Sequence, residues 1–371
     1  MNPELKYWIW FANLKGITTR KKVELLRIFD DPSAIYGADA VELAKTGLLS
    51  RDNIDAIMSD EYRKTADKTM EDVDRHRISV VPMNSSDYPE ALRNICDPPV
   101  CLYVKGKLVS DEISVAVVGS RRASGYGLTQ AKKISGELAR LGICVISGMA
   151  RGIDTAAHIG ALTANGRTVA VLGCGLDMAY PPENRKLMEQ IIETGAVISE
   201  YPPGVEPAPH HFPVRNRIVS GMSAGVLVVE AGERSGSLIT AQLALEQGRD
   251  VYALPGNIVS VNSKGTNKLI QDGAKLVTSV EDIIEELHWY KQFIAGNVPD
   301  SGVNLNMKTA SFELSPEERD VLELLSVESL SIDEIQRKLS VNMPLLHGIL
   351  LSLEMKGLIK REPGGRYNIE I

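Results

Sequence analysis

The chain has 371 residues, which at roughly 150 residues per domain predicts two or three domains. Hydrophobic residues make up 44% and charged residues 24%, a composition that excludes disordered and fibrous chains. The net charge of −7, from 41 basic and 48 acidic residues, excludes a globally basic nucleic-acid-binding protein but not a local basic site. No apolar run approaches the ~18 residues of a membrane span, and the N-terminus does not resemble a signal peptide. The four cysteines form no C-x-x-C pair and are expected to be reduced thiols. We therefore expect a cytoplasmic protein.

Residues 1–85 are predicted to form a small helical domain of the SAM or helix-hairpin-helix type. Apolar side chains recur at helical spacing over 19–29, and a second helical unit follows at 40–58. The turn Gly16-Ile17-Thr18 is similar to half of a helix-hairpin-helix motif, in which a glycine turn presents backbone N–H groups to a phosphate. A helical domain without that role is the alternative. Prolines over 80–104 then predict an extended connector.

Residues 86–290 alternate apolar runs with helical stretches and are predicted to form an extended Rossmann-like domain. The runs are β-branched, as expected of parallel strands buried on both faces, and lie at 115–118, 143–146, 169–172, 196–198, 226–229 and 251–253. Helical stretches lie between them at 128–141, 154–164, 184–193 and 238–247. This alternation predicts an α/β fold with a doubly wound, mostly parallel sheet, whose ligand site lies outside the carboxyl ends of the strands.

The C-terminal residues are predicted to form a linker, 291–312, and a winged-helix domain, 313–371. The linker is polar and aperiodic. The domain begins with an N-cap serine, Ser315, followed by proline at the first helical position. Helices are predicted at 317–325, 332–339 and 343–356, and a hairpin follows that turns at Pro363-Gly364-Gly365.

Four of the predicted strands end in turns of glycine and small polar residues, at 119–127, 147–154, 173–177 and 230–237. Glycine lets backbone N–H groups approach a ligand closely, and the following helix N-terminus carries partial positive charge. Four such turns at one edge of a sheet indicate an anion cradle for a phosphate-bearing ligand. A single turn of this kind can instead serve tight packing.

Basic side chains concentrate at the same predicted edge. Residues 113–190 contain nine basic and five acidic residues, a local charge of +4. Several of the arginines fall in predicted loops, and arginine suits bidentate recognition of phosphate. Lys132, Lys133 and Arg140 are equally explained as a solvated helix face.

The segment 210–217 places two histidines, an aromatic ring and two arginines in a predicted loop before a strand. Stacking of a base on Phe212, with Arg215 and Arg217 on phosphates, is one interpretation. A loop that buttresses the sheet and buries Phe212 is the other. Two adjacent histidines offer too few ligands for zinc, so we expect no metal.

Sequence signatures of cofactor binding and catalysis are missing. The first strand–helix turn has no G-x-G-x-x-G, and the chain has neither a P-loop nor a G-x-S-x-G elbow. Asp154 is as well explained as a helix cap as a catalyst, and nothing pairs Asp177 or Glu230 with a nucleophile. We therefore expect no cofactor.

Seven segments of the middle block carry a specific pattern: Val-Ala-Val-Val-Gly-Ser-Arg (115–121), Ser-Gly-Met-Ala-Arg-Gly-Ile-Asp (147–154), Val-Leu-Gly-Cys-Gly-Leu-Asp (171–177), Phe-Pro-Val-Arg-Asn-Arg-Ile-Val (212–219), Arg-Ser-Gly-Ser-Leu-Ile-Thr (234–240), Ala-Leu-Pro-Gly-Asn (253–257) and Gly-Thr-Asn-Lys-Leu-Ile-Gln-Asp-Gly-Ala (265–274). In order and spacing they resemble the DNA-processing protein A family, also called Smf. The flanking blocks are similar to the family in architecture alone.

The resemblance implies a bacterial single-stranded-DNA-binding protein of natural transformation and homologous recombination. It would protect incoming single strands and help to load the recombinase RecA onto them, without catalysing a reaction. The family's DNA pocket includes the arginine of the Gly-Ser-Arg turn, here Arg121, and a basic residue in the loop 180–186. Some members have lysine where this chain has Pro182, so Arg185 or Lys186 would supply that charge here.

The predicted DNA-binding residues combine the strand-edge turns with the loop at 180–186 and the segment at 210–217. They are Gly119, Ser120, Arg121, Arg122, Gly148, Arg151, Gly152, Gly173, Gly175, Asn184, Arg185, Lys186, Phe212, Arg215, Asn216, Arg217, Ser235, Gly236 and Ser237.

The family dimerises through the C-terminal part of the Rossmann-like domain, and its recombinase-binding surface lies in the same region. This implies that Leu245, Asn267 and Leu276 form a homodimer or RecA surface, although apolar residues there can equally belong to the core. The predicted winged helix has seven basic and eleven acidic residues over 311–371, so we favour protein contact or regulation over duplex DNA binding. Duplex DNA binding stays an alternative, because the predicted wing carries three basic residues, Lys360, Arg361 and Arg366.

Two other functions are compatible with this kind of fold. The LOG-type nucleotide phosphoribohydrolases use a P-G-G-x-G-T-x-x-E signature, and the glutamate is absent after the corresponding turn at 232–240. That absence argues against cleavage between base and ribose. A regulatory or scaffold protein whose sheet binds a nucleotide is the second alternative.

Overall fold

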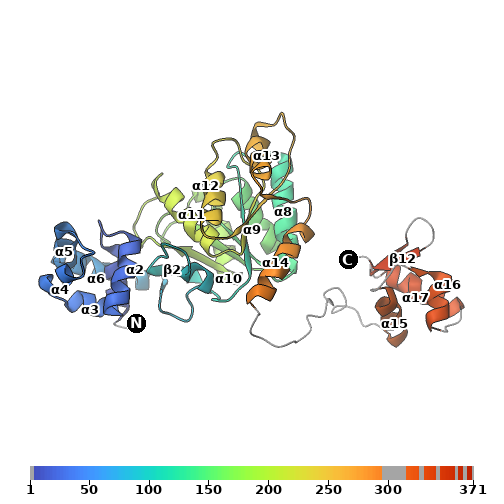
Figure 1. Ribbon diagram of the computed structural model, residues 1–371, viewed down its shortest axis with the longest axis horizontal. Coiled ribbons are helices and arrows are strands. Elements are labelled where there is room, and N and C mark those ends of the chain that lie inside the picture. The colour runs from blue at the N-terminus through green and yellow to red at the C-terminus, as the bar shows by residue number, and fades with distance from the viewer. Residues whose placement is uncertain are drawn as a thin grey trace. The chain divides into compact units, whose positions relative to one another are not determined.

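The computed structural model describes residues 4–294, 315–325, 330–339, 343–355, 358–361 and 366–369. It divides into two compact units, Met1–Gly296 and Asn297–Ile371 (Figure 1). The first unit holds an N-terminal helical region and a large sheet, and the second holds helices with a small sheet. The finer division of the chain at residues 85, 290 and 312 stays a prediction. None of the helices in the described ranges combines the length and the apolar run that a bilayer crossing requires.

Polar caps define most of the N-terminal helices. Thr18, Asp31, Asp39, Ser50 and Ser59 each accept a hydrogen bond from a backbone N–H of the helix that follows. The helices are α1 (Leu5–Asn13), α2 (Thr19–Phe29), α3 (Pro32–Gly37), α4 (Ala40–Lys45), α5 (Arg51–Met58) and α6 (Asp60–Arg75). The prediction of an N-terminal helical region is therefore confirmed.

The turn between α1 and α2 has a glycine in the left-handed region. Gly16 has a φ of 79°, which glycine adopts without the steric cost of a Cβ atom. The side chain of Asn53 on α5 donates to the Gly16 carbonyl at 3.0 Å and fixes the turn. A phosphate contact at this turn stays a prediction.

Lys22 on α2 is a buried lysine, with 6% of its surface exposed. Its Nζ donates to the Ala12 carbonyl at 2.5 Å. Burial lowers the pKa of Lys22 to about 8, and the nearby carboxylate of Glu200 opposes this change. The buried ammonium therefore costs folding free energy at neutral pH.

We expect Lys22→Met to stabilise the protein at pH 7 by about 2 kcal/mol. Lowering the pKa of Lys22 from 10.5 to about 8 costs the wild type roughly 3 kcal/mol of stability, which the variant avoids. The variant loses about 1 kcal/mol with the hydrogen bond to the Ala12 carbonyl. Between about pH 8 and 10.5 the unfolded chain binds the proton and the native state does not, so wild-type stability rises with pH there and the variant's does not. Denaturant unfolding at several pH values measures this. The exposed Lys15→Met is the matched control, and an equal pH dependence in wild type and Lys22→Met would contradict the expectation.

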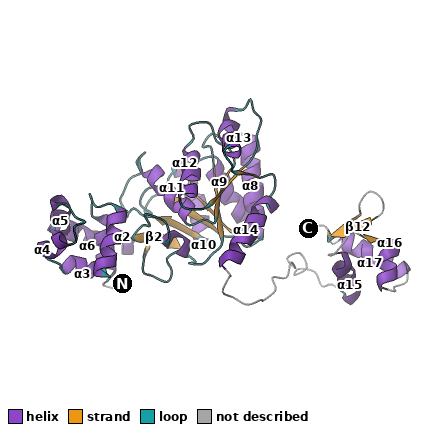
Figure 2. Cartoon of the chain, in the orientation of Figure 1, coloured by secondary structure: helices purple, strands orange, loops and turns teal. Residues whose placement is uncertain are grey.

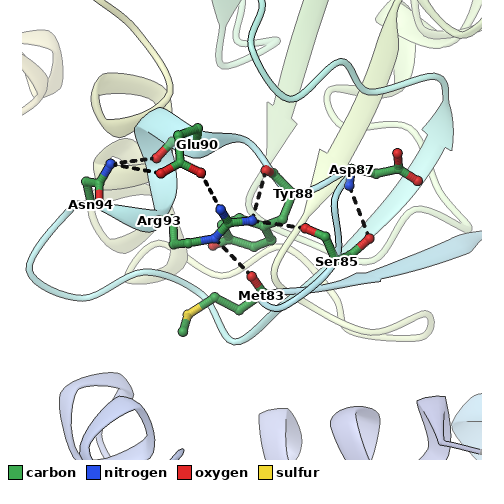
Figure 3. Close-up of polar contacts among 7 residues, drawn as sticks. All are labelled: Met83, Ser85, Asp87, Tyr88, Glu90, Arg93 and Asn94. Atoms are coloured by element: carbon green, nitrogen blue, oxygen red, sulfur yellow. Dashed lines mark hydrogen bonds and ion pairs between the residues drawn. The ribbon is translucent and has the colours of Figure 1, made fainter. Parts of the chain in front are cut away.

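The connector after the N-terminal helices is folded around Arg93. Its Nε donates to the Met83 carbonyl at 3.1 Å, its Nη2 donates to the Ser85 carbonyl at 3.0 Å, and its Nη1 pairs with Glu90 (Figure 3). The prediction of an extended connector is wrong, because the segment forms β1 (Ser79–Pro82), α7 (Glu90–Arg93) and β2 (Cys101–Gly106). β1 thus begins the sheet inside the block that was predicted to be helical.

One sheet of nine strands runs in the order β1-β2-β6-β5-β4-β3-β7-β8-β9 within the described residues. Figure 2 draws its strands in orange among the helices. Neighbours from β6 to β9 pair in parallel, whereas β2 pairs antiparallel with β1 and β6. This confirms the doubly wound, mostly parallel sheet. The remaining strands are β3 (Ser114–Val118), β4 (Cys144–Ser147), β5 (Thr168–Leu172), β6 (Ala196–Ser199), β7 (Gly225–Val228), β8 (Asp250–Ala253) and β9 (Lys275–Leu276).

Both faces of the sheet are covered, because alternate side chains of each strand enter different cores. In β3, Val115 and Val117 pack on one face, whereas Ala116 and Val118 pack on the other. The first face carries α8 (Gly125–Arg140), α9 (Ile153–Thr163) and α14 (Glu281–Ile294), and the second carries α11 (His211–Gly221) and α12 (Gly236–Glu246). Further helices are α10 (Arg185–Thr194) and α13 (Lys264–Gln271), with 3-10 turns at Pro182–Asn184 and Val261–Ser263.

The order of the strands reverses between β3 and β7. From β3 the chain adds β4, β5 and β6 on one side, and it then returns to add β7, β8 and β9 on the other. The loops that follow β3 and β7 therefore diverge and leave a crevice at the carboxyl edge, where open α/β sheets bind ligands.

The second unit has the elements that the sequence predicts for a winged helix. They are α15 (Pro316–Leu325), β10 (Leu330–Ser331), α16 (Ile332–Leu339), α17 (Met343–Met355), β11 (Ile359–Arg361) and β12 (Arg366–Ile369), with strand order β10-β12-β11. Val321, Ile335, Leu346, Leu353 and Tyr367 lie in its core. The predicted turn at 363–365 and the linker beyond Ile294, where α14 ends, lie outside the described residues.

Candidate nucleic-acid interface

The loops at the switch point line an open cavity of about 760 Å³, which we call the arginine pocket. It is lined by residues that follow β3, β4 and β7 and by the start of α11. Helices α8, α9 and α12 begin at this edge, so their N-termini add partial positive charge. The volume falls within the roughly 300–1,000 Å³ that is typical of small-ligand sites.

The structure brings eleven of the nineteen predicted DNA-binding residues into the arginine pocket, where their contact with DNA stays a prediction. These are Gly119, Ser120, Arg121, Arg122, Gly148, Phe212, Arg215, Asn216, Ser235, Gly236 and Ser237. The other eight do not line it. They are Arg151, Gly152, Gly173, Gly175, Asn184, Arg185, Lys186 and Arg217.

Three exposed arginines, Arg121, Arg122 and Arg234, surround the mouth of the pocket. The guanidinium of Arg121 lies 5.2 Å from the centre of the Phe212 ring, and that ring stacks on Tyr180 at 5.5 Å. A cation over an aromatic face, next to a second ring, offers a phosphate contact and a base-stacking surface side by side.

Most backbone N–H groups of the predicted anion cradle already donate hydrogen bonds to other groups of the protein. The Ser120 amide donates to the Glu230 carbonyl at 2.8 Å, and the Ser124 amide donates to the Glu230 carboxylate at 2.9 Å. Asp154 accepts from the amides of Gly148 at 3.2 Å and Ala150 at 3.3 Å. Side chains, rather than these amides, therefore remain to recognise a ligand.

Asp154 and Glu230 both have partners that hold the loops of the pocket together. Burial raises the pKa of Asp154, and Arg215 and the two amides oppose that change. Glu230 is buried and also accepts hydrogen bonds from the Ser124 hydroxyl and from Asn262. The described residues contain no cluster of three or more His, Cys, Asp or Glu side chains suited to a metal.

Glycines at 148 and 152 allow close packing around the pocket floor. A Cβ atom on Gly148 would lie 2.1 Å from Nη1 of Arg215, and one on Gly152 would lie 2.3 Å from the Ser120 carbonyl oxygen. Gly152 also has a φ of 77°. Gly148 therefore lets the Arg215 side chain approach, and Gly152 lets the loops after β3 and β4 meet, so tight packing explains both without a ligand.

Gly173 and Gly175 at the end of β5 have a similar packing role. A Cβ atom on Gly173 would lie 3.1 Å from the Phe212 ring, and one on Gly175 would lie 2.7 Å from the Pro202 carbonyl oxygen. The Gly175 amide donates to the Val205 carbonyl at 2.8 Å. Neither glycine lines the arginine pocket.

The segment at 211–221 is the helix α11 and not the predicted loop. Because Arg215 and Arg217 lie two positions apart on a helix, they point in different directions. Arg215 lies buried at the pocket floor and donates to the Val171 carbonyl, while its Nε has no hydrogen-bond partner among the described residues. Burial lowers the pKa of Arg215 to about 10, and Asp154 opposes this change.

Arg217 is turned away from the pocket and forms ion pairs with two partly exposed carboxylates. Its Nη2 lies 2.7 Å from Oε1 of Glu200, and its Nε lies 3.0 Å from Oδ2 of Asp97. Its side chain is 6% exposed. The expectation that Arg217 binds phosphate does not fit this position.

The loop at 180–186 presents its charges outside the pocket. Arg151 pairs with Glu183, and the side chain of Asn184 is buried, where it donates to the Met149 carbonyl at 2.9 Å. Arg185 and Lys186 are exposed in the first turn of α10, beside the exposed Pro182. They remain candidates for the charge that lysine supplies in some family members.

Tyr180 and Arg234 line the pocket but are missing from the predicted DNA-binding residues. Arg234 has a recognisable signal, since it stands among glycine and serine in a turn that follows a strand. Tyr180 has none, because its contact with Phe212 joins segments that are 32 positions apart.

The three predicted dimer or RecA residues differ in their environments. Leu245 is 57% exposed and Leu276 is 45% exposed, so neither belongs to the core. Asn267 accepts from the Gly256 amide at 3.1 Å and donates to the Gly256 carbonyl at 3.0 Å. Asn267 thus holds the loop after β8, and its role in an interface stays a prediction.

An open α/β sheet with an arginine-lined pocket at its switch point defines a Rossmann-like ligand-binding protein. The model of the DNA recombination-mediator protein A family matches residues 79–288, and the model of the DprA winged helix domain matches residues 306–365. The chain belongs to the DNA recombination-mediator protein A family.

Individual relatives agree with this assignment. Protein Smf of Escherichia coli is 38% identical over 90% of this chain and 92% of its own length. The X-ray structure of DNA processing protein A (DprA) from Streptococcus pneumoniae has a TM-score of 0.66 and 38% identity, covering 76% of this chain and 97% of that one. The DNA processing protein A of Helicobacter pylori, described for its single-stranded DNA binding mode, has a TM-score of 0.51 and 30% identity, covering 58% of this chain and 97% of that one.

Proposed function

We propose that this protein binds single-stranded DNA in the arginine pocket and acts in DNA processing during transformation and recombination. The observation that carries the proposal is the placement of Arg121 over the Phe212 ring at the switch point, at 5.2 Å. Arg122 and Arg234 add charge at the mouth, and the buried Arg215 adds charge at the floor. Phosphates are held by these guanidinium groups and a base lies against the ring.

The geometry favours a single strand over a duplex. A ring such as Phe212 is reached by a base only when that base is unpaired and unstacked. The pocket of about 760 Å³ has the volume of a small-ligand site. The printed description of the Helicobacter pylori relative, which concerns single-stranded DNA, supports the same ligand.

Further parts of the function follow from the family. We infer that the chain protects single strands and helps to load RecA onto them in the cytoplasm, as a homodimer and without catalysing a reaction. The exposed Leu245 and Leu276 support a contact surface in this region. The winged helix serves protein contact or regulation. Arg366 on its wing supports this, because its charge is paired with Glu334 at 3.1 Å.

The phosphoribohydrolase alternative is not favoured. The turn at 232–240 leads into α12 without the signature glutamate, and the relatives are named for DNA processing. A nucleotide-binding regulator also lacks a specific observation in its favour.

A gel-shift comparison tests the proposal. Single-stranded oligonucleotides should be shifted at much lower protein concentration than the same sequences as duplexes. Addition of RecA should give a further, slower-migrating complex on the single strand and none on the duplex. Equal shifts of single strand and duplex would contradict the pocket, and a RecA-independent pattern would remove the loading role.

A further inference from the structure

Aromatic rings continue beyond the arginine pocket along the carboxyl edge of the sheet. Tyr201, which follows β6, stacks on His211 at the start of α11 with the ring centres 4.2 Å apart and the planes 26° apart. His210 meets His211 edge-on at 4.4 Å. Tyr201 and His211, here called the Tyr201–His211 pair, are partly exposed, and neither lines the pocket.

The Tyr201–His211 pair is held in place by hydrogen bonds before any ligand arrives. Nδ1 of His211 donates to the Gly173 carbonyl at 3.1 Å. The Tyr201 amide donates to the Ser199 hydroxyl at 3.0 Å, and that hydroxyl donates to the Cys174 carbonyl at 2.7 Å. A ligand that stacks here therefore loses little affinity to the ordering of side chains.

The proline-rich loop that joins Tyr201 to His211 is also fixed. The carboxylate of Asp177 accepts from the Gly204 amide at 2.9 Å, and the Gly175 amide donates to the Val205 carbonyl at 2.8 Å. The glycine predicted to cradle a phosphate instead fastens this loop to the end of β5.

The pair is continuous with the pocket through Phe212. His211 precedes Phe212 in the chain, and a Cβ atom on Gly173 would contact both side chains, at 3.1 Å for the Phe212 ring and 3.5 Å for Cβ of His211. Beside Tyr201, the carboxylate of Glu200 is paired with Arg217 at 2.7 Å, and the Tyr201–His211 pair itself presents aromatic faces. Such faces recognise nucleobases of any sequence.

We propose that the Tyr201–His211 pair is a second base-stacking platform for a single strand whose phosphates are held in the arginine pocket. This inference rests on the proposed function. A strand longer than the pocket runs along the carboxyl edge from β3 toward β6, with one base on Phe212 and a later base on the pair.

Replacement of Tyr201 by leucine separates the two platforms. For an oligothymidylate of about 16 nucleotides we expect Tyr201→Leu to weaken binding about five- to tenfold, the loss typical of one stacked base. For an oligothymidylate of about 4 nucleotides, which fills only the pocket, the affinity should stay at the wild-type value. Tyr201→Phe keeps the ring and should restore tight binding of the long strand.

Cross-linking provides a second readout that does not depend on a variant. Long strands with a single 5-iodouracil, placed at successive positions, are irradiated on the wild-type protein and the cross-linked peptide is identified. We expect cross-links at Tyr201 or His211 from one position and at Phe212 or Tyr180 from another.

The outcomes distinguish the platform from the proposed function. Wild-type affinity of Tyr201→Leu for the long strand, equal weakening for both strands, or no cross-link at the pair would each overturn the platform while the pocket stands. Failure of the folded wild type to bind either strand would overturn the proposed function, and the platform with it.

Discussion

Arg121→Ala should weaken binding of single-stranded DNA by about tenfold or more, the largest loss expected from any single exposed side chain. The substitution removes a charge-assisted phosphate contact, worth roughly 1.5–3 kcal/mol, and 1.4 kcal/mol corresponds to tenfold in affinity. It also removes the cation that lies 5.2 Å from the centre of the Phe212 ring. Fluorescence anisotropy with a labelled oligonucleotide at fixed salt measures the change.

The matched control for this experiment is Arg140→Ala. Arg140 is exposed in the last turn of α8, the helix that follows the Arg121 turn, and does not line the arginine pocket. It carries the same charge, so its removal changes the net charge of the protein equally. Equal losses in the two variants would show that the effect comes from overall charge and not from the pocket.

Arg217→Met should destabilise the protein by about 3 kcal/mol, because it leaves Glu200 and Asp97 without their common partner. The side chain of Glu200 is 22% exposed and cannot regain full hydration after the loss. Affinity for single-stranded DNA should be nearly unchanged at temperatures where the variant is folded. Urea unfolding and oligonucleotide titration of the same sample measure both effects.

A double-mutant cycle with Glu200→Gln isolates the ion pair. In the Glu200→Gln background the cost of Arg217→Met should shrink, because the partly exposed carboxylate charge of Glu200 is already gone. An unchanged cost in that background would show that packing, not charge, explains the loss. A large loss of DNA affinity in folded Arg217→Met would show that Arg217 contributes to DNA binding after all.

The central strands could be predicted from the sequence because each is buried on both faces. The run 115–118 coincides with most of β3, and the run 169–172 with most of β5. β1 and β2 were missed because the prolines around them indicated a connector, although β2 is an apolar run. β9 has only two residues, and β1 ends at Pro82, which suits an edge strand.

The candidate site could be predicted as a region but not as a set of contacts. Glycine-rich turns at strand ends and local positive charge indicated the carboxyl edge of the sheet, where the arginine pocket lies. Side-chain direction could not be predicted, since 211–221 was not identified as a helix, and that helix sends Arg215 to the pocket floor and Arg217 to Glu200. Hydrogen bonds between distant segments could not be predicted either. The Ser124 amide, for example, donates to Glu230 and is therefore not available to a ligand.

The net charge of the chain does not show where its basic side chains lie. The chain carries −7 overall, yet four arginines and two carboxylates line the pocket. An acidic C-terminal region and a positive strand edge are both hidden in the total. Binding to DNA therefore depends on a local potential that salt can screen.

The most direct test of the account is a titration of wild-type protein with a single-stranded oligonucleotide and with its duplex over a series of salt concentrations. We predict tighter binding of the single strand at every salt concentration and an affinity that falls steadily as salt rises, with a logarithmic slope of about −2 for roughly three neutralised phosphates. Equal affinity for single strand and duplex, or an affinity that does not change with salt, would contradict a single-strand site built on these arginines.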